Sequence, residues 1–312
     1  MKHEILMSGK MYAKTMEVLD ATYTTHKLWE APDQKKKLAE LAPRIRAAAA
    51  GSGKFDAAMM DALPNLKLIA NFGVGVDSID VKAATQRGIA VTNTPDVLTD
   101  EVADLAMGLV IAAARRMAFA DRYVRDGSWV NKGSMPFTRR VHGKTLGILG
   151  LGRIGLAIAK RAEAFGMPIL YNQRRKRSDA NYRYVADLTE MAKLSDFLMV
   201  SCPGGPETAR LVNEKVLRAL GPDGIVVNIA RGSVIDEPVM VRLLKEGAIG
   251  GAGLDVFADE PRVPAELLAM DHVVLQPHQG SATPETRTAM GQLVIDNLAA
   301  FFANKPLLTK VG

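Results

Sequence analysis

Of the five histidines in the chain, His278 is best placed to transfer a proton. It closes a short apolar run, follows Pro277 and precedes a run of small residues. A histidine side chain titrates close to neutral pH, so a histidine at a strand end is suited to general acid–base catalysis. The remaining histidines are interpreted as surface or supporting residues: His3, His26, His142 and His272.

Arg231 is the second candidate, because it directly follows the apolar run 225–229. Ligands bind at the carboxyl ends of parallel strands, and a guanidinium there can hold a carboxylate through two parallel hydrogen bonds. A surface ion pair is the alternative, although Gly232 would allow the tight turn that a ligand-facing arginine needs. The order of residue types therefore predicts an anion-binding group near the proton donor.

Three carboxylates precede His278 and could pair with it. A carboxylate that accepts a hydrogen bond from an imidazole nitrogen sets the tautomer and favours the charged ring. Residue types alone leave the partner open among Asp255, Asp259 and Glu260.

The segment Gly150-Leu151-Gly152-Arg153-Ile154-Gly155 has the spacing G-x-G-x-x-G. An apolar strand (145–149) runs into it and an alanine-rich helix (156–165) follows. In that context the first glycine allows the turn, the second lets a pyrophosphate approach, and the third lets the helix pack on the strand. The motif predicts a dinucleotide site, with a ligand-free glycine-rich turn as the alternative.

The strand after the motif ends in Asn172, where an NAD site would carry a carboxylate for the ribose hydroxyls. Arg174 and Arg175 follow within three residues. Because a guanidinium matches phosphate oxygens and no carboxylate repels them, this loop favours NADPH/NADP⁺, with NADH as a weaker cofactor. A solvated basic loop is the alternative.

The elements that must position these residues alternate between strands and helices. Strands are expected at 5–7, 22–29, 45–49, 66–71, 89–92, 145–149, 168–173, 197–202, 224–230, 250–257 and 272–278. Helices are expected at 12–19, 35–41, 55–63, 100–125, 156–165, 188–194, 212–220, 238–245 and 284–303. The alternation predicts an α/β fold of two doubly wound, Rossmann-like or flavodoxin-like parallel-sheet domains, with the active site in the cleft between them.

Composition excludes several other classes of protein. The 312 residues carry a net charge of +6 in short, scattered basic clusters, and only 5% are aromatic, which disfavours nucleic-acid binding. The longest apolar run, 105–114, is too short for a membrane span, and the N-terminus does not look like a secretory signal. A single cysteine, Cys202, excludes a disulfide framework and a cysteine-based metal cluster. We therefore expect a cytoplasmic protein without a metal.

Further segments carry a resemblance to a known family: Asn71–Asp77 (NFGVGVD), Val227–Gly232 (VNIARG), Leu254–Pro261 (LDVFADEP) and Gln276–Thr283 (QPHQGSAT). Together with the glycine motif, the chain resembles the D-2-hydroxyacid dehydrogenase family, and within it the NADPH-dependent glyoxylate/hydroxypyruvate reductases. The resemblance implies hydride reduction of a small 2-keto acid, such as glyoxylate or hydroxypyruvate, to the D-2-hydroxy acid, glycolate or D-glycerate.

The resemblance also assigns roles to the candidate residues. It implies that Arg231 holds the substrate carboxylate and polarises the keto oxygen, that His278 donates the proton, and that Glu260 is its partner. Asp255 would then lie towards the nicotinamide, with Asp259 on the surface. The consecutive N–H groups of Val74 and Gly75 would form a small nest for the substrate carboxylate; an ordinary strand–helix turn is the alternative.

The resemblance further implies a discontinuous substrate domain (1–98 plus 284–312), a dinucleotide-binding domain (99–283) and a homodimer. Trp129 resembles an aromatic residue that related reductases lend to the partner subunit's site, or it belongs to the dimer core. Cofactor contacts are expected from Thr99, Gly150, Leu151, Gly152, Arg153, Ile154, Gly155, Asn172, Arg174, Arg175, Cys202, Pro203, Thr208, Ile229, Ala230, Arg231, Asp255, His278 and Gly280.

Two alternatives remain from the sequence. One is a D-specific reductase of bulkier 2-keto acids, which would share every motif above. The other is a nucleotide-sensing, corepressor-like binding protein on the same scaffold, which would also keep the arginine, glutamate and histidine. An assay with glyoxylate, hydroxypyruvate and NADPH separates them.

Overall fold

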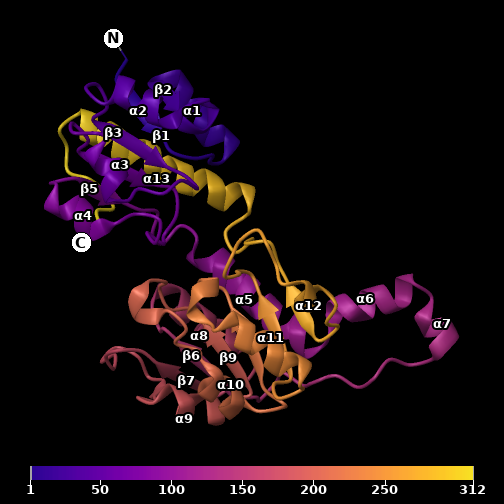
Figure 1. The fold of residues 1–312 in the computed structure, drawn as a ribbon. Coiled ribbons are helices and arrows are strands. Elements are labelled where there is room, and N and C mark those ends of the chain that lie inside the picture. The colour runs from indigo at the N-terminus through magenta and orange to yellow at the C-terminus, as the bar shows by residue number, and fades with distance from the viewer. Residues whose placement is uncertain (1, 312) are drawn as a thin grey trace. The chain divides into compact units, whose positions relative to one another are not determined.

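The computed structural model describes residues 2–311, which form two compact α/β units (Figure 1). Unit 1 comprises Met1–Leu98 with Ser281–Gly312, and unit 2 comprises Thr99–Gly280. Each unit has its own parallel sheet, which agrees with the predicted fold class.

Unit 1 is built on a five-stranded sheet with the order β2-β1-β3-β4-β5. All its paired strands are parallel, so their carboxyl ends share one edge. This strand order places a topological switch point between β1 and β3, and ligands of such sheets bind at the carboxyl edge. The strands are β1 (Glu4–Met7), β2 (Thr24–Lys27), β3 (Ala47–Ala50), β4 (Leu68–Asn71) and β5 (Ala90–Thr92).

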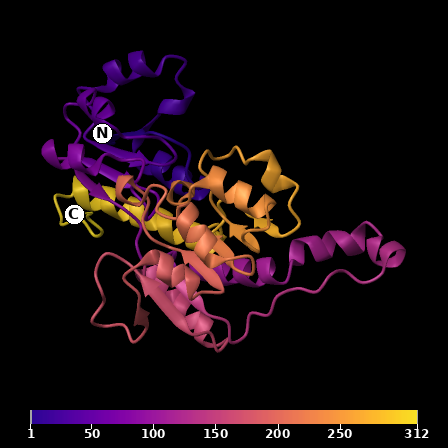
Figure 2. The same cartoon turned by 60° about the horizontal axis from the view of Figure 1, so that its bottom comes forward.

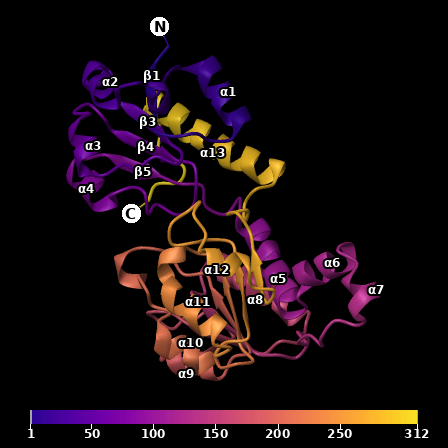
Figure 3. The same ribbon diagram turned by 45° about the vertical axis from the view of Figure 1, so that its right-hand side comes forward.

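Helices cover both faces of this sheet, as Figure 3 shows. On one face, residues such as Ile5, Ala49 and Leu68 pack with Leu19 and Leu298 of α1 (Ala13–Thr22) and α13 (Pro284–Phe302). On the other, alternate strand residues pack against α2 (Gln34–Leu41), α3 (Ala57–Asp61) and α4 (Val81–Gln86). Burial on both faces explains the almost wholly apolar strand sequences. A short 3₁₀ turn, η1 (Leu28–Glu30), follows β2.

Unit 2 is built on a seven-stranded parallel sheet with the order β12-β11-β10-β9-β6-β7-β8. From β8 to β11 this is the dinucleotide-binding order, whose switch point lies between β6 and β9. The strands are β6 (Leu146–Leu149), β7 (Ile169–Asn172), β8 (Arg183–Tyr184), β9 (Phe197–Val200), β10 (Ile225–Asn228), β11 (Gly251–Leu254) and β12 (Val273–Leu275).

The core of unit 2 also has helices on both faces of the sheet. Leu198, Val226 and Leu254 belong to an apolar cluster with α9 (Leu188–Lys193), α10 (Glu214–Leu220) and α11 (Glu237–Lys245). On the opposite face, α5 (Thr99–Ala114) and α8 (Arg153–Glu163) pack together and against the sheet. The short elements are α12 (Ala265–Leu268), η2 (Pro206–Thr208) and η3 (Gly232–Val234).

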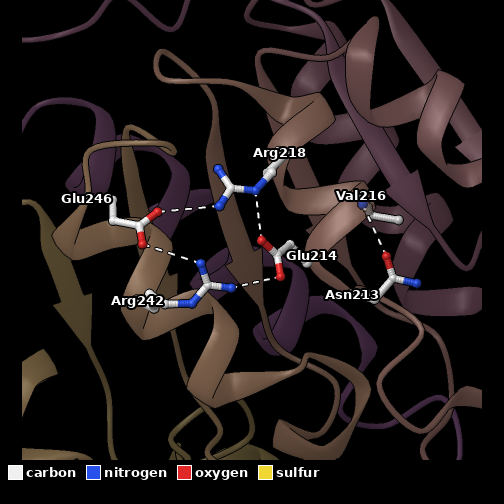
Figure 4. Close-up of polar contacts among 6 residues, drawn as sticks. All are labelled: Asn213, Glu214, Val216, Arg218, Arg242 and Glu246. Carbon is white, nitrogen blue, oxygen red and sulfur yellow. Dashed lines mark hydrogen bonds and ion pairs between the residues drawn. The ribbon is translucent and has the colours of Figure 1, made fainter.

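An exposed ring of ion pairs joins α10 to α11 (Figure 4). Arg218 contacts Glu214 at 2.8 Å and Glu246 at 3.4 Å, while Arg242 contacts the same two carboxylates at 2.7 and 3.3 Å. The two guanidinium groups lower the pKa of Glu214. Each exposed pair contributes little to stability on its own, and together the pairs link α10 to α11.

The predicted long helix 100–125 is wrong as a single element. The chain forms α5, then α6 (Met117–Arg125) and α7 (Ser128–Lys132), with a break where Arg116 adopts the left-handed region (φ 49°). In Figure 2 the α6–α7 segment projects from the remainder of unit 2. Trp129 and Val130 of this segment are exposed apolar side chains, and so is Phe137 in the loop that follows it. Among the helices of residues 2–311, none is long and apolar enough to cross a membrane.

Candidate active site and cofactor site

His278 and Glu260 form a direct pair in unit 2. The Nδ1 atom of His278 lies 2.7 Å from Oε2 of Glu260. Because a carboxylate only accepts, Nδ1 carries the hydrogen, and Nε2 is then the nitrogen that can exchange a proton with a ligand. The other oxygen of Glu260, Oε1, accepts the Phe257 N–H at 3.1 Å, which holds the carboxylate in place. Asp259 pairs instead with Arg262, so the structure selects Glu260 from the three candidate carboxylates.

Asp255 holds the turn that carries His278. Its Oδ1 accepts the N–H of Gln279 at 2.6 Å and its Oδ2 that of Gly280 at 2.9 Å, while its carbonyl accepts the N–H of His278 at 2.9 Å. These contacts hold His278 in the left-handed region (φ 55°), which a non-glycine residue adopts only when its surroundings enforce it. Burial raises the pKa of Asp255, although the two N–H donors oppose that shift. Its expected contact with the nicotinamide stays a prediction.

Arg231 follows β10 in a turn set by two neighbours. Asn228 is buried, with its Oδ1 accepting the N–H of Ala230 at 3.0 Å and its Nδ2 donating to the carbonyl of Arg231 at 2.9 Å. Gly232 packs so closely on the Phe257 backbone that a Cβ atom there would overlap it. The Arg231 turn therefore contacts the segment that ends in Glu260, and Nη1 of Arg231 donates to the carbonyl of Ala230 at 2.6 Å.

The glycine motif has the geometry of a dinucleotide site. Gly150 adopts φ 95°, and a Cβ there would lie 2.6 Å from the backbone of Cys202. A Cβ on Gly155 would overlap the carbonyl of Gly150, whereas Gly152 faces open space at the start of α8. Within residues 2–311, the N–H groups of Ile154 and Gly155 donate to no acceptor. These features fit a pyrophosphate at the N-terminus of an eleven-residue helix.

The basic loop after β7 is divided between structural and exposed side chains. Arg177 donates to the carbonyl of Leu151 at 2.9 Å and pairs with Asp179, so it supports the glycine motif. Arg174 and Arg175 are exposed, and Arg174 pairs with Glu207 at 2.5 Å. Of the two, Arg175 has no side-chain partner among residues 2–311.

Asn172, predicted from the sequence to contact the cofactor, makes hydrogen bonds within the fold. Its side chain is buried, and Nδ2 donates to the carbonyls of Val185 at 2.8 Å and Ala186 at 2.9 Å. The neighbouring Gln173 accepts the N–H of Leu151 at 3.1 Å and so contacts the glycine motif directly. Gln173 was not among the cofactor-site residues predicted from the sequence, although it contacts the glycine motif.

Cys202 is buried beside Gly150, and burial raises the pKa of its thiol to about 11. At neutral pH the thiol is therefore protonated and not a nucleophile. The following loop is closed by Thr208, whose hydroxyl lies 2.8 Å from the Pro203 carbonyl and 3.2 Å from that of Gly205.

Three further predicted cofactor residues also have defined positions. Thr99 begins α5, and Ile229 and Ala230 lie buried between β10 and Arg231. Whether any of them touches a cofactor stays a prediction. Among residues 2–311, no group of three or more histidine, cysteine, aspartate or glutamate side chains could hold a metal ion.

The candidate anion nest of unit 1 is held by two asparagines whose role the sequence analysis missed. Asn71 donates Nδ2 to the carbonyls of Gly73 at 3.0 Å and Gly75 at 2.9 Å. Asn93 donates Nδ2 to the carbonyl of Val74 at 2.9 Å. All three loop carbonyls are therefore hydrogen-bonded, whereas within residues 2–311 the N–H groups of Val74 and Gly75 donate to no acceptor.

A cavity of about 320 Å³ also lies in unit 1, beside the start of α13. Arg287 lines it, with its guanidinium 5.8 Å from the centre of the Phe72 ring, next to the nest. The other lining residues are Tyr12, Ala282, Thr283 and Pro284.

These features define a nicotinamide-dependent oxidoreductase: a dinucleotide-binding sheet, with an arginine, a glutamate and a histidine at the ends of its strands. Comparison with known proteins agrees with that class. Residues 107–280 match the family described as D-isomer specific 2-hydroxyacid dehydrogenase, NAD binding domain. The chain belongs to the D-isomer specific 2-hydroxyacid dehydrogenase family.

Similar proteins extend over nearly the whole chain. The chain is 48% identical over 308 residues to hydroxyphenylpyruvate reductase of Plectranthus scutellarioides and 45% identical over 308 residues to glyoxylate/hydroxypyruvate reductase A of Arabidopsis thaliana, each over 98% of both chains. Among solved structures, an NADPH-dependent glyoxylate/hydroxypyruvate reductase of Sinorhizobium meliloti, in complex with NADP and malonate, is similar with a TM-score of 0.92 and 43% identity. It covers 100% of this chain and 97% of that one.

Proposed function

We propose that the protein reduces a small 2-keto acid, such as glyoxylate or hydroxypyruvate, to the D-2-hydroxy acid with NADPH. The observation that carries this proposal is the 2.7 Å contact of His278 with Glu260 at the edge of a dinucleotide-binding sheet. Steady-state kinetics with glyoxylate, hydroxypyruvate and NADPH test it. A chain that binds the nucleotide but turns over neither these two acids nor bulkier 2-keto acids would instead support the corepressor-like alternative.

The dinucleotide would be held by the glycine motif, with its pyrophosphate at the N–H groups of Ile154 and Gly155, which fit an anion. When bound, the nicotinamide supplies the hydride for the carbonyl carbon. The chain itself must then anchor the substrate and deliver a proton to its oxygen.

Anchoring falls to Arg231 and to the nest at Val74 and Gly75. The guanidinium of Arg231 can bind a carboxylate and polarise the neighbouring keto oxygen, which lowers the cost of developing negative charge. His278 donates its Nε2 proton to that oxygen, and Glu260 keeps the ring correctly oriented and stabilises its charged form. Each of these roles is part of the proposal.

The preference for NADPH is proposed to come from Arg174 and Arg175. We expect the double variant Arg174→Ala/Arg175→Ala to raise KM for NADPH by about 10- to 100-fold with little change for NADH, because only NADPH offers a 2′-phosphate to charge-assisted hydrogen bonds. The effect should shrink at high salt, since both side chains are exposed.

The matched control is Lys176→Ala, which removes an exposed positive charge from the same loop. If the double variant raises KM for both cofactors equally, or if Lys176→Ala has the same effect, the loop is merely a solvated basic segment. Asn172→Asp is not a suitable variant for creating a preference for NADH. That change would bury a carboxylate against the carbonyls of Val185 and Ala186, which now accept from the asparagine amide.

A second candidate substrate class is bulkier 2-keto acids, because the Plectranthus relative is named for hydroxyphenylpyruvate. A substrate panel at saturating NADPH, from glyoxylate to 4-hydroxyphenylpyruvate, ranks the two by kcat/KM. We also propose a homodimer formed through the α6–α7 segment and the loop that follows it, since Trp129 of α7 and Phe137 of that loop are exposed and suit a protein interface.

A further inference from the structure

The C-terminal segment of unit 1 connects to the nest by a chain of hydrogen bonds. Asn297 of α13 is fully buried; its Nδ2 lies 3.0 Å from Oγ1 of Thr309, and its Oδ1 accepts the N–H of Leu308 at 3.0 Å. The Thr309 hydroxyl donates to the carbonyl of Asn93 at 2.6 Å. Asn93 in turn donates to the carbonyl of Val74 at 2.9 Å.

The backbone of the same segment pairs with the edge of the sheet. The N–H of Asn93 donates to the carbonyl of Thr309 at 3.2 Å, and that of Val311 donates to the carbonyl of Val91 at 2.8 Å. Thr92 and Lys310 form an antiparallel bridge. Asn93 is therefore held through its main-chain N–H and its carbonyl by a single residue, Thr309.

Because the peptide unit is planar, these contacts also set the direction of the neighbouring N–H groups. In a trans peptide, the carbonyl of one residue points opposite to the N–H of the next. Holding the Val74 carbonyl with Asn93 therefore directs the Gly75 N–H away from Asn93. The Gly73 carbonyl accepts from the Asn71 side chain and from the Thr94 N–H. These contacts direct the Val74 N–H away from Asn71 and Thr94.

We propose that Thr309 and Asn93 are positioning residues, through which the C-terminal segment sets the direction of the anion-binding N–H groups of the 73–75 loop. The inference rests on the proposed function, in that the anion is taken to be the substrate carboxylate. A segment that only covered the edge of β5 would need the backbone pairing alone. The hydrogen bonds from Asn297 through Thr309 and Asn93 to the Val74 carbonyl, here called the relay, extend beyond that edge and end on the loop.

The relay makes Thr309→Val the informative variant, because valine keeps the shape and removes the hydroxyl. We expect KM for glyoxylate to rise about 3- to 12-fold, the size expected for losing the hydrogen bond from Thr309 to Asn93. We expect kcat to stay within about twofold of wild type and the Kd for NADPH to be unchanged. The inhibition constant of oxalate, used as an unreactive carboxylate probe, should rise by the same factor. Thr309→Ser restores the hydroxyl and should recover the wild-type values.

Lys310→Ala is the matched control, since Lys310 is exposed and shares the backbone pairing without joining the relay. Hydrogen exchange of the 71–76 segment gives a readout independent of turnover, and it should become faster in Thr309→Val but not in Lys310→Ala. The proposal is overturned if Thr309→Val and Lys310→Ala behave alike, if serine fails to rescue, or if kcat falls while KM stays constant.

Failure of the proposed function would look different from failure of this inference. In the first case the wild-type protein would turn over neither glyoxylate nor hydroxypyruvate. In the second it would turn them over normally, and neither the KM nor the exchange of the 71–76 segment would respond to the loss of the Thr309 hydroxyl.

Discussion

The variant His278→Gln is expected to lower kcat for 2-keto acid reduction by about 10²–10⁴-fold, the size of a lost general acid. The Nδ1–H of His278 is directed at Glu260 at 2.7 Å, so Nε2 is the atom that would deliver the proton in the proposed reaction. A glutamine amide can donate a hydrogen bond to the substrate oxygen but cannot give up its proton. Steady-state kinetics at saturating NADPH measure the loss, and fluorescence titration checks that NADPH still binds.

His272→Gln is a suitable control for that experiment. His272 directly precedes β12, partly buried, and burial lowers its pKa. The side-chain hydrogen bonds of Glu260 and Asp255 go to other residues, so replacing His272 should leave kcat within about twofold of wild type. A kcat in His278→Gln that stays within a few fold of wild type at neutral pH would show that another group supplies the proton.

Much of this site follows from sequence because parallel sheets collect ligand-binding residues at one edge. Apolar runs mark β6 and β10, and the residues just after such runs lie at that edge, as with Gly150 and Arg231. The partner of His278 needed more. Chain order left Asp255, Asp259 and Glu260 open, and only the resemblance and then the geometry separated them.

The supporting contacts were beyond sequence because they join residues far apart in the chain through single side chains. Asn93 and Thr309 are 216 positions apart, and neither residue type indicates that its partner is the other. Asn172 shows the reverse difficulty. Its place at the end of β7 suggested a ribose contact, but its amide donors are used to hold the Val185–Ala186 segment beside β7.

The break after α5 was missed for a related reason. Helix periodicity continues through residues 115 and 116, and no proline or glycine lies between residues 109 and 126. The left-handed conformation of Arg116 coincides with contacts from outside the helix, since the Arg115 side chain donates to Thr138 and the Arg139 N–H donates to the Ala114 carbonyl. Contacts with a later segment override local propensity here.

The second large effect is expected from Arg231→Lys, which keeps the charge but removes the planar fork. We expect kcat/KM for glyoxylate to fall by about 10²–10³-fold, similar to the loss of one donor that stabilises a developing oxyanion. Both constants should change, with KM higher and kcat lower, because anchoring of the carboxylate and polarisation of the keto oxygen depend on the same group.

The geometry of the turn makes this substitution informative. Asn228 and Gly232 hold the backbone around Arg231 through contacts that do not involve its side chain, and these contacts should remain when lysine replaces arginine. The contact of the Arg231 side chain with the Ala230 carbonyl would change. Arg218→Lys is the matched control, since Arg218 belongs to the exposed ion-pair ring of α10 and α11 and should not affect turnover.

The two kinetic constants of Arg231→Lys separate its two roles. A rise in KM with kcat preserved would mean that Arg231 binds the carboxylate in ground state and transition state alike, leaving polarisation of the keto oxygen to His278. If both constants match wild type, Arg231 has neither role. The substrate carboxylate would then have to bind the N–H groups of Val74 and Gly75 alone, and variants of Asn93 that disturb this loop should carry the whole loss of affinity.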